Sequence, residues 1–143
     1  MAARTGPVGT SDQLEIQDLV TRYNRAIDRG DIDGWVACFT PDGAFDGVLG
    51  RKEGAAALRA FATELNEGPE GERFRPMRHW TTNFVIDHDG DDDAARMRAD
   101  HLLVRPRGTD GVELVLTAIY HDRLRRVDGR WLFAERVVEV TSQ

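Results

Sequence analysis

The stretch that decides the fold is residues 23–46, YNRAIDRGDIDGWVACFTPDGAFD, in which one amphipathic helix ends, a second begins and a strand follows. Apolar side chains lead into it at helical spacing and form one stripe, namely Ile16, Leu19, Val20, Tyr23 and Ile27. Gly30 is a natural stop for this first helix, and Asp31 or Asp33 can cap the second. We interpret the stretch as one wall of a small-molecule pocket.

Local signals place the remaining N-terminal elements. Thr10 and Gln13 have the spacing of a capping box, so the first helix is expected to begin there. Pro41-Asp42-Gly43 predicts a turn before a short strand at about residues 44–46. Apolar residues at helical spacing predict a third helix from about residue 53 to residue 65.

After residue 75 the apolar spacing shortens and β-branched and aromatic residues accumulate. Four strands are expected, at about residues 77–87, 94–105, 112–127 and 130–140, and Asp128-Gly129 is a strong two-residue hairpin signal. Helices followed by a long meander predict an α+β fold with about three helices on a curved antiparallel sheet. We expect a flexible lead-in over residues 1–9 and a single domain over residues 10–143.

Composition excludes several classes of protein. The formal net charge of -6 argues against a nucleic-acid partner, because phosphate binding needs clustered cations. No apolar run approaches the roughly 20 residues that span a membrane, and the N-terminus lacks the apolar segment of a signal peptide, so we expect a cytoplasmic protein. Cys38 is the single cysteine, which excludes an intramolecular disulfide and a multi-cysteine zinc site.

The order of these residues resembles that of the SnoaL-like proteins in the nuclear transport factor 2-like superfamily. The matching positions are Tyr23, Ile27, Asp28, Asp31, Trp35, Phe39, Asp42 and Phe45 near the N-terminus, then Arg78, His79, Asn83, Tyr120, Asp122, Asp128, Gly129, Trp131 and Arg136. The resemblance implies a cone-shaped α+β barrel with a largely apolar cavity at its open end, and a homodimer formed through the sheet.

Within this superfamily the chain is most similar to the branch that contains scytalone dehydratase and bile-acid dehydratase. The resemblance implies a catalytic pair at Asp28 and His79, with Tyr23 as a third catalytic group and Arg136 at a substrate-binding position. It implies further substrate-binding positions at Trp35, Asn83, Tyr120 and one of two neighbours, Asp100 or His101. One shift of strand register exchanges those two neighbours, and polarity favours His101.

Chemistry explains why these residue types suit elimination of water next to a carbonyl, or isomerisation of an enone. A base must take a proton from carbon, and a donor must hold the developing enolate oxygen. A histidine suits the first task, a carboxylate can orient it, and a tyrosine hydroxyl can donate to the oxygen. This set needs neither a metal ion nor an organic cofactor.

The expected function is therefore a dehydratase-like lyase or isomerase that acts on a small, largely apolar ring compound such as a polyketide or steroid. Two alternatives stay open. A polyketide cyclase or epoxide hydrolase shares the fold, and the hydrolase would need Asp28, Arg136 and either Asp100 or Asp122 to converge. A non-catalytic domain for binding small molecules or for dimerisation is the other alternative.

Periodicity leaves the site geometry open. Asp28 lies about 140° around the helix from Tyr23 and would be solvated, unless the helix loosens before Gly30 or the second helix covers it. Alternation places His79 on one strand face with Thr81, Asn83 and Val85.

The sequence also leaves undecided how His101 and Arg136, on two later strands, are placed relative to the cavity. Alternation places His101 on the inner face with Met97, Ala99 and Leu103. Counting outward from the Asp128-Gly129 turn places Arg136 opposite His121, on the outer face. Arg136 then reaches the cavity only through a β-bulge or at the end of the sheet.

Overall fold

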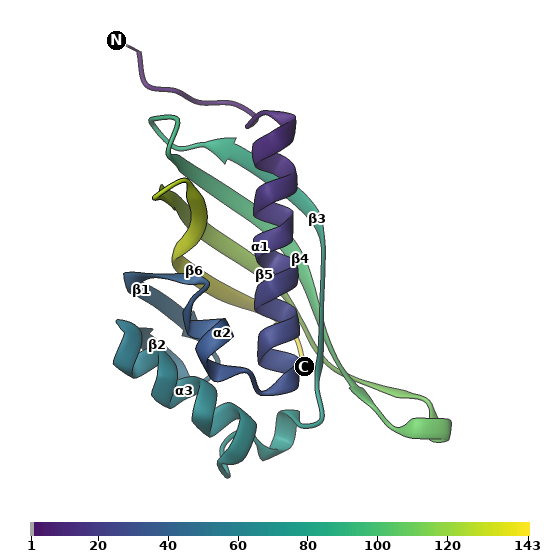
Figure 1. Ribbon diagram of the computed structural model, residues 1–143. Coiled ribbons are helices and arrows are strands. Elements are labelled where there is room, and N and C mark those ends of the chain that lie inside the picture. Colours follow the sequence, from purple (N-terminus) through teal and green to yellow (C-terminus); the bar gives the residue numbers. More distant parts are fainter. Residues whose placement is uncertain (1) are drawn as a thin grey trace.

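Three helices lie on one face of a six-stranded sheet in the computed structural model, which describes residues 2–143 (Figure 1). The elements, in chain order, are α1 (Thr10–Arg29), α2 (Ile32–Val36), β1 (Phe39–Gly47), β2 (Gly50–Glu53), α3 (Ala55–Glu67), η1 (Glu72–Phe74), β3 (Arg78–His88), β4 (Ala94–Pro106), η2 (Gly108–Asp110), β5 (Val112–Val127) and β6 (Arg130–Ser142). The α+β class and the packing of the helices on a curved sheet are as predicted.

The sheet is mixed. Its strand order is β2-β1-β6-β5-β4-β3, and β1 runs parallel to β6 while the other neighbouring pairs are antiparallel. An entirely antiparallel sheet was expected, and the parallel pair arises because α3 and β3–β5 separate β1 from β6 in the chain. The sheet also contains β2, which the sequence did not predict: its four residues are polar or glycine and show no apolar alternation.

The first and last turns of α1 are fixed by different contacts. Gly9 is the N-cap and makes no side-chain cap, so the predicted Thr10–Gln13 capping box is wrong. Asp12 instead accepts hydrogen bonds from Arg126 (2.8 Å) and Trp131 (3.0 Å), which tie the start of α1 to the β5–β6 hairpin. Gly30 ends the helix in the left-handed conformation (φ 74°), as predicted.

Helix α2 begins where an aspartate can cap it. The Asp31 side chain accepts a hydrogen bond from the Gly34 backbone N–H (3.0 Å). Of the two candidate caps, Asp31 and Asp33, Asp31 is therefore the residue that caps α2. The helix is only one turn long and buries Trp35. It therefore serves mainly to place that indole under the end of α1.

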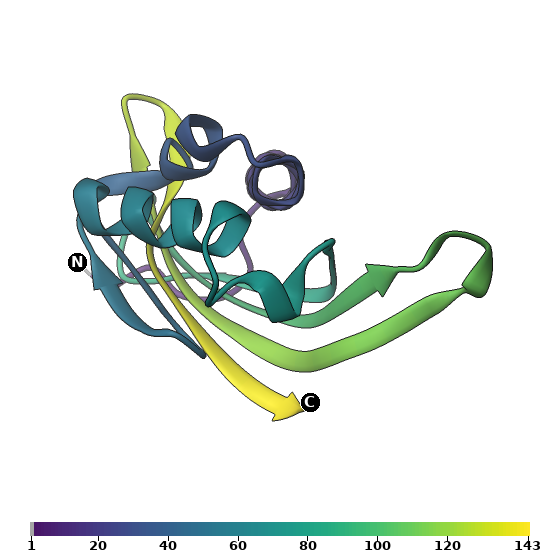
Figure 2. The same ribbon diagram turned by 90° about the horizontal axis from the view of Figure 1, so that it is seen from below.

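Irregularities in the strands bend the sheet around the helices (Figure 2). The register shifts in the β3–β4, β4–β5 and β5–β6 pairs, at Thr82/Val85, Leu103/Val104 and Arg123/Leu124 among other places. Such bulges insert extra residues and increase local twist. The far end of the β4–β5 hairpin projects away from the body as an arm.

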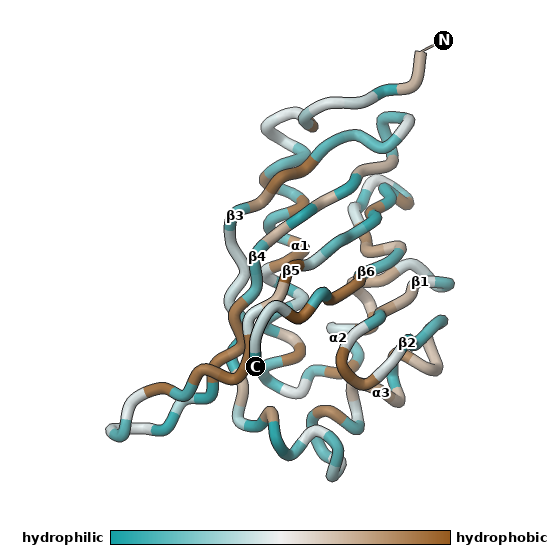
Figure 3. The backbone as a smooth tube through the Cα atoms, turned by 180° about the vertical axis from the view of Figure 1, so that it is seen from behind, coloured by the Kyte–Doolittle hydropathy of each residue, from teal (hydrophilic) through white to brown (hydrophobic). Residues whose placement is uncertain are grey.

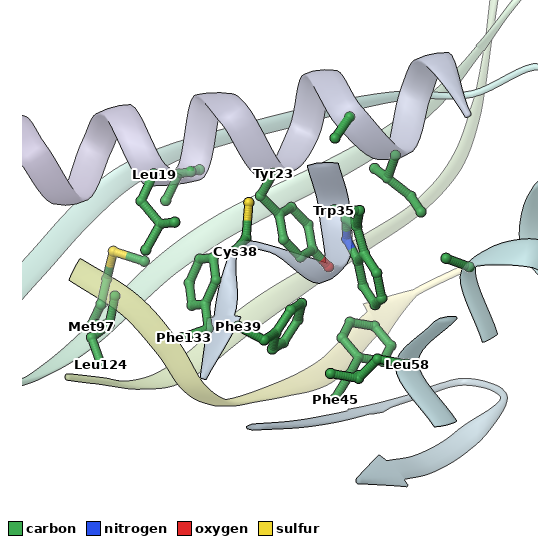
Figure 4. Close-up of a cluster of buried hydrophobic side chains, with 14 of the residues drawn as sticks. Leu19, Tyr23, Trp35, Cys38, Phe39, Phe45, Leu58, Met97, Leu124 and Phe133 are labelled. Carbon is green, nitrogen blue, oxygen red and sulfur yellow. The ribbon is translucent and has the colours of Figure 1, made fainter. Parts of the chain in front are cut away.

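The core between helices and sheet is rich in aromatic rings (Figure 4). Trp35 and Phe39 lie 4.9 Å apart between ring centroids, and Tyr23 contacts Phe133 edge-on at 5.4 Å. The rings come from α1, α2, β1 and β6, so this cluster joins the quoted stretch to the last strand.

The segment before α1 runs beside β3 and the turn that follows it. Arg4 pairs with Gly90 and Pro7 pairs with Asp87 as β-bridges, and Val8 is buried. Met1 lies outside the described residues. None of the helices in residues 2–143 is long and apolar enough to cross a membrane.

Candidate active site

A cavity opens between the end of α1, α2, α3 and the concave face of the sheet. Its volume is about 60 Å³, counted as the space open to the centres of water-sized spheres. The walls are mainly aromatic and aliphatic, with Trp35, Phe45 and Phe61 among them. The lining also includes two tyrosines and two histidines, Tyr23, Tyr120, His79 and His101.

Asp28 and His79 form a hydrogen-bonded pair at the cavity wall. Asp28 Oδ1 lies 2.6 Å from His79 Nδ1, and the His79 backbone N–H donates to Asp28 Oδ2 at 3.0 Å. The side chains are 10% and 9% exposed, respectively. Because an ionised carboxylate only accepts, Nδ1 carries the proton in this pair, and in the neutral imidazole Nε2 then keeps a free lone pair. The carboxylate thus fixes both the tautomer and the position of the ring.

The start of β3 explains why Asp28 is sheltered although helical periodicity predicts a solvated side chain. Helix α1 stays regular through Arg29, so the helix does not loosen before Gly30. The partner of Asp28 is His79, at the beginning of β3 and 51 residues later in the chain, rather than a residue of α2. Strand β3 therefore supplies the cover that local patterns could not reveal.

His101 lies in the cavity wall beside His79, as alternation predicted, and Asp100 does not. The His101 ring stacks on that of His79 (centroids 5.1 Å apart) and on that of Tyr120 (4.6 Å). Burial lowers the pKa of His101 to about 2, assisted by the neighbouring charges of His79 and Arg136. His101 is consequently a neutral imidazole at physiological pH.

Asn83 and Asp100 lie outside the cavity, which corrects the expectation that Asn83 binds substrate there. Asn83 Nδ2 donates to Asp100 Oδ2 at 2.8 Å, and both residues are exposed. Asn83 has a φ of 58° within the β3 bulge. The bulge ends the alternation that begins at His79, so Asn83 and Val85 face outward while Ile86 is buried.

Arg136 is completely buried and forms a two-point ion pair with Asp122. Nε and Nη2 donate to the two carboxylate oxygens at 2.8 and 2.9 Å. Burial alone would lower the pKa of Arg136, but the Asp122 charge and its hydrogen bonds raise it above the ordinary value. Arg136 is thus a permanent cation, yet it is not among the residues that line the cavity.

A β-bulge brings Arg136 inward. Leu124 pairs with Phe133 as simple counting predicts, but Arg123 pairs with Glu135, which leaves Ala134 as an extra residue. Arg136 therefore lies opposite Asp122 instead of opposite His121. Its guanidinium packs over the rings of Tyr120 (3.7 Å), Phe133 (4.2 Å) and Tyr23 (4.5 Å), behind the cavity wall.

The sequence interpretation missed two parts of the wall. Val48 and Leu49, in the turn between β1 and β2, and Phe74 and Met77, around η1, line the cavity. Val48-Leu49 is an apolar pair flanked by Gly47 and Gly50, which is a signal that a turn carries apolar side chains toward a pocket. Phe74 stands alone in a polar loop and had no such pattern.

Comparison with known proteins places the chain in a family. Residues 9–137 match the model of the SnoaL-like domain, so the chain belongs to the SnoaL-like domain family. None of the curated protein sequences matches it.

Several solved structures share the fold. A variant of Rv3472 from Mycobacterium tuberculosis, described as of unknown function, is 31% identical over 92% of this chain and 77% of its own, with a TM-score of 0.79. A protein of unknown function with a cystatin-like fold from Nostoc punctiforme is 28% identical over 94% and 95% of the two chains, with a TM-score of 0.78. A proposed scytalone dehydratase from Novosphingobium aromaticivorans (TM-score 0.75, coverage 92% and 85%) is 20% identical and supports the fold alone.

Proposed function

We propose that the protein is a dehydratase-like lyase or isomerase that works by acid–base chemistry of its own side chains. The observation that carries this proposal is the Asp28–His79 pair, which presents a histidine of fixed tautomer to an apolar cavity. In this reaction His79 Nε2 takes a proton from the carbon next to a carbonyl, and Asp28 stabilises the imidazolium that forms. For a hydroxyketone, the same proton then goes to the departing hydroxyl, which leaves as water.

The substrate oxygen would be held by neutral donors. Tyr23 and Tyr120 line the cavity and each carries a hydroxyl group, and His101 contributes an imidazole that carries no charge. A developing enolate is stabilised by donors that are already in place and shielded from water. We assign this role to the two tyrosines and give His101 the task of supporting the ring of Tyr120, on which it stacks.

Cavity size and charge constrain the substrate. The cavity offers about 60 Å³ to the centres of water-sized spheres, which is more than a single water molecule requires and suits a compact ligand. The charged groups nearest to it are already paired, Asp28 with His79 and Arg136 with Asp122. A neutral single-ring ketone fits these properties better than a carboxylate or phosphate ester.

Two of the alternatives, an epoxide hydrolase and a non-catalytic domain, lack comparable support. The epoxide hydrolase arrangement needs Asp28, Arg136 and a second aspartate together, but Asp28 is bound to His79 and Arg136 to Asp122. A non-catalytic domain would be favoured by a separated Asp28 and His79 and a filled cavity. The pair is instead within hydrogen-bond distance at an open cavity.

The test follows the first half of the reaction, the removal of a proton from carbon. Small cyclic ketones and enones in heavy water would be followed by NMR for exchange of their α-protons. We expect His79→Ala to slow exchange by about a hundredfold to ten-thousandfold, because the base is lost. Asp28→Asn should slow it by about ten- to a hundredfold, because the imidazole loses its orienting partner.

His121→Ala is the matched control, because His121 is exposed and pairs with Glu139 on the outer face. Its exchange rate should equal that of the unsubstituted protein. The proposal is wrong if the His79 and Asp28 variants cause exchange as fast as the unsubstituted protein does. It is also wrong if the unsubstituted protein causes no exchange in any of the ketones and enones tested.

A further inference from the structure

The guanidinium of Arg136 lies in the core just behind the cavity wall. It is fully buried, it is absent from the cavity lining, and the rings of Tyr23 and Tyr120 lie over it. A substrate in the cavity therefore meets the tyrosines and not the arginine. Any contribution of Arg136 to the site must pass through these two tyrosines.

Arg136 is held in one orientation. Its two hydrogen bonds to Asp122 use Nε and Nη2, and the carboxylate occupies the neighbouring position across the β5–β6 ladder. Nη1 is buried and has no hydrogen-bond partner among the described residues. A planar, delocalised cation of this kind suits stacking against aromatic faces, and its distance to the Tyr120 ring centroid is 3.7 Å.

A cation over the face of a phenol ring favours electron density on that ring. The attraction grows when the hydroxyl gives up its proton or shares it with an acceptor, since the ring then becomes more negative. We propose that Arg136, fixed by Asp122, is a positioning residue that strengthens the hydroxyls of Tyr23 and Tyr120 as hydrogen-bond donors to a substrate oxygen. This inference deepens the proposed function and rests on it for the presence of that oxygen.

The charges around the tyrosines give the proposal a definite sign. Burial raises the pKa of both hydroxyls, and the positive charge of Arg136 opposes that rise. The hydrogen-bond donors of Arg136 and Trp35 also oppose the rise in the pKa of Tyr23, and the negative charge of Asp122 adds to the rise in both. Asp28 and the other tyrosine also raise the pKa of Tyr120. His101, stacked on Tyr120, stays neutral, and His79 lies beyond it.

The chain offers a direct readout, because Tyr23 and Tyr120 are its two tyrosines. Labelling with fluorinated tyrosine, whose phenol is more acidic, allows ¹⁹F NMR to follow both ionisations without a substrate, and Tyr23→Phe assigns the signals. The double variant Arg136→Met/Asp122→Leu removes both charges of the ion pair and is called the charge-free variant. In it we expect the midpoint pH of tyrosine ionisation to rise by about one pH unit or more. If the substitutions only loosened the core, the midpoint would fall instead, because burial is what raises both tyrosine pKa values.

Asp122→Asn is the second variant. It should lower the midpoint pH of tyrosine ionisation, because Arg136 then lacks its compensating anion. Arg98→Met, which removes an exposed cation on the outer face, should change neither signal. A midpoint pH that is unchanged or lower in a folded charge-free variant overturns the inference. If that variant does not fold, a midpoint in Asp122→Asn that equals or exceeds that of the unsubstituted protein overturns it. Since the titration needs no turnover, its failure is distinct from failure of the proposed function.

Discussion

His101 is a polar side chain held in an environment far from that of water. It is 5% exposed, lies between two other rings, and its Nδ1 has no hydrogen-bond partner among the described residues. An imidazole in such a place costs less as the neutral species than as the cation. The fold therefore holds two adjacent histidines in different chemical roles, His79 against a carboxylate and His101 against a phenol ring.

This burial predicts a loss of stability in acid. The pKa of His101 is about 2 in the folded protein and 6.5 when unperturbed, so below pH 6.5 the unfolded chain binds a proton that the folded chain does not. The free energy of unfolding should fall by about 1.4 kcal/mol for each pH unit below about 6. Urea unfolding between about pH 7 and pH 5 measures this slope.

His101→Gln should remove that part of the slope, whereas His121→Gln, at an exposed histidine, should leave it unchanged. An NMR titration gives an independent check, because the imidazole signals of His101 should not move above about pH 4. Movement of those signals with a midpoint near 6 would contradict the prediction.

At the scale of elements, regular patterns were predictable and irregular positions were not. Strand β5 has the predicted bounds, because apolar and polar residues alternate along it and turn signals flank it. Asp28 was ambiguous because its cover comes from β3, and no pattern within α1 records that contact. The direction of Asn83 and Arg136 depends on bulges, which change the face of every later side chain but leave composition unchanged.

The β6 bulge is itself a testable element. Deletion of Ala134 should remove the bulge and keep Arg136 opposite Asp122, because Glu135 then directly follows Phe133 and still pairs with Arg123. The deletion should therefore cost less than the roughly 3–5 kcal/mol of breaking a buried ion pair. Arg136→Met should cost that full amount, because it leaves Asp122 buried without its partner. Thermal and urea unfolding measure both changes, and a deletion as destabilising as Arg136→Met would show that the extra residue is needed to hold the pair.

At the scale of the whole molecule, the helices cover one face of the sheet and leave the other open (Figures 1 and 3). Large apolar side chains on β3 and β5 are exposed there or on the arm, with Trp80 65%, Val112 63% and Leu114 69% exposed. Trp80 pairs with the half-buried Leu102 of β4, so apolar surface continues onto the neighbouring strand, whereas Leu114 pairs with Val104, which is buried. Contiguous apolar surface of this kind marks an interaction site.

We expect two copies to pair through this face, because burying Trp80 and Leu114 removes apolar area from water at about 25 cal/mol per Å². Trp80→Glu and Leu114→Glu should each shift the protein toward the monomer, since a carboxylate placed at the centre of such an interface has no partner. Leu14→Glu is the control, because Leu14 is 63% exposed but lies on α1, on the opposite side of the sheet. Sedimentation equilibrium over a range of concentrations measures the association. A monomer before any substitution, or a dimer that dissociates equally with Leu14→Glu, would contradict pairing through the sheet.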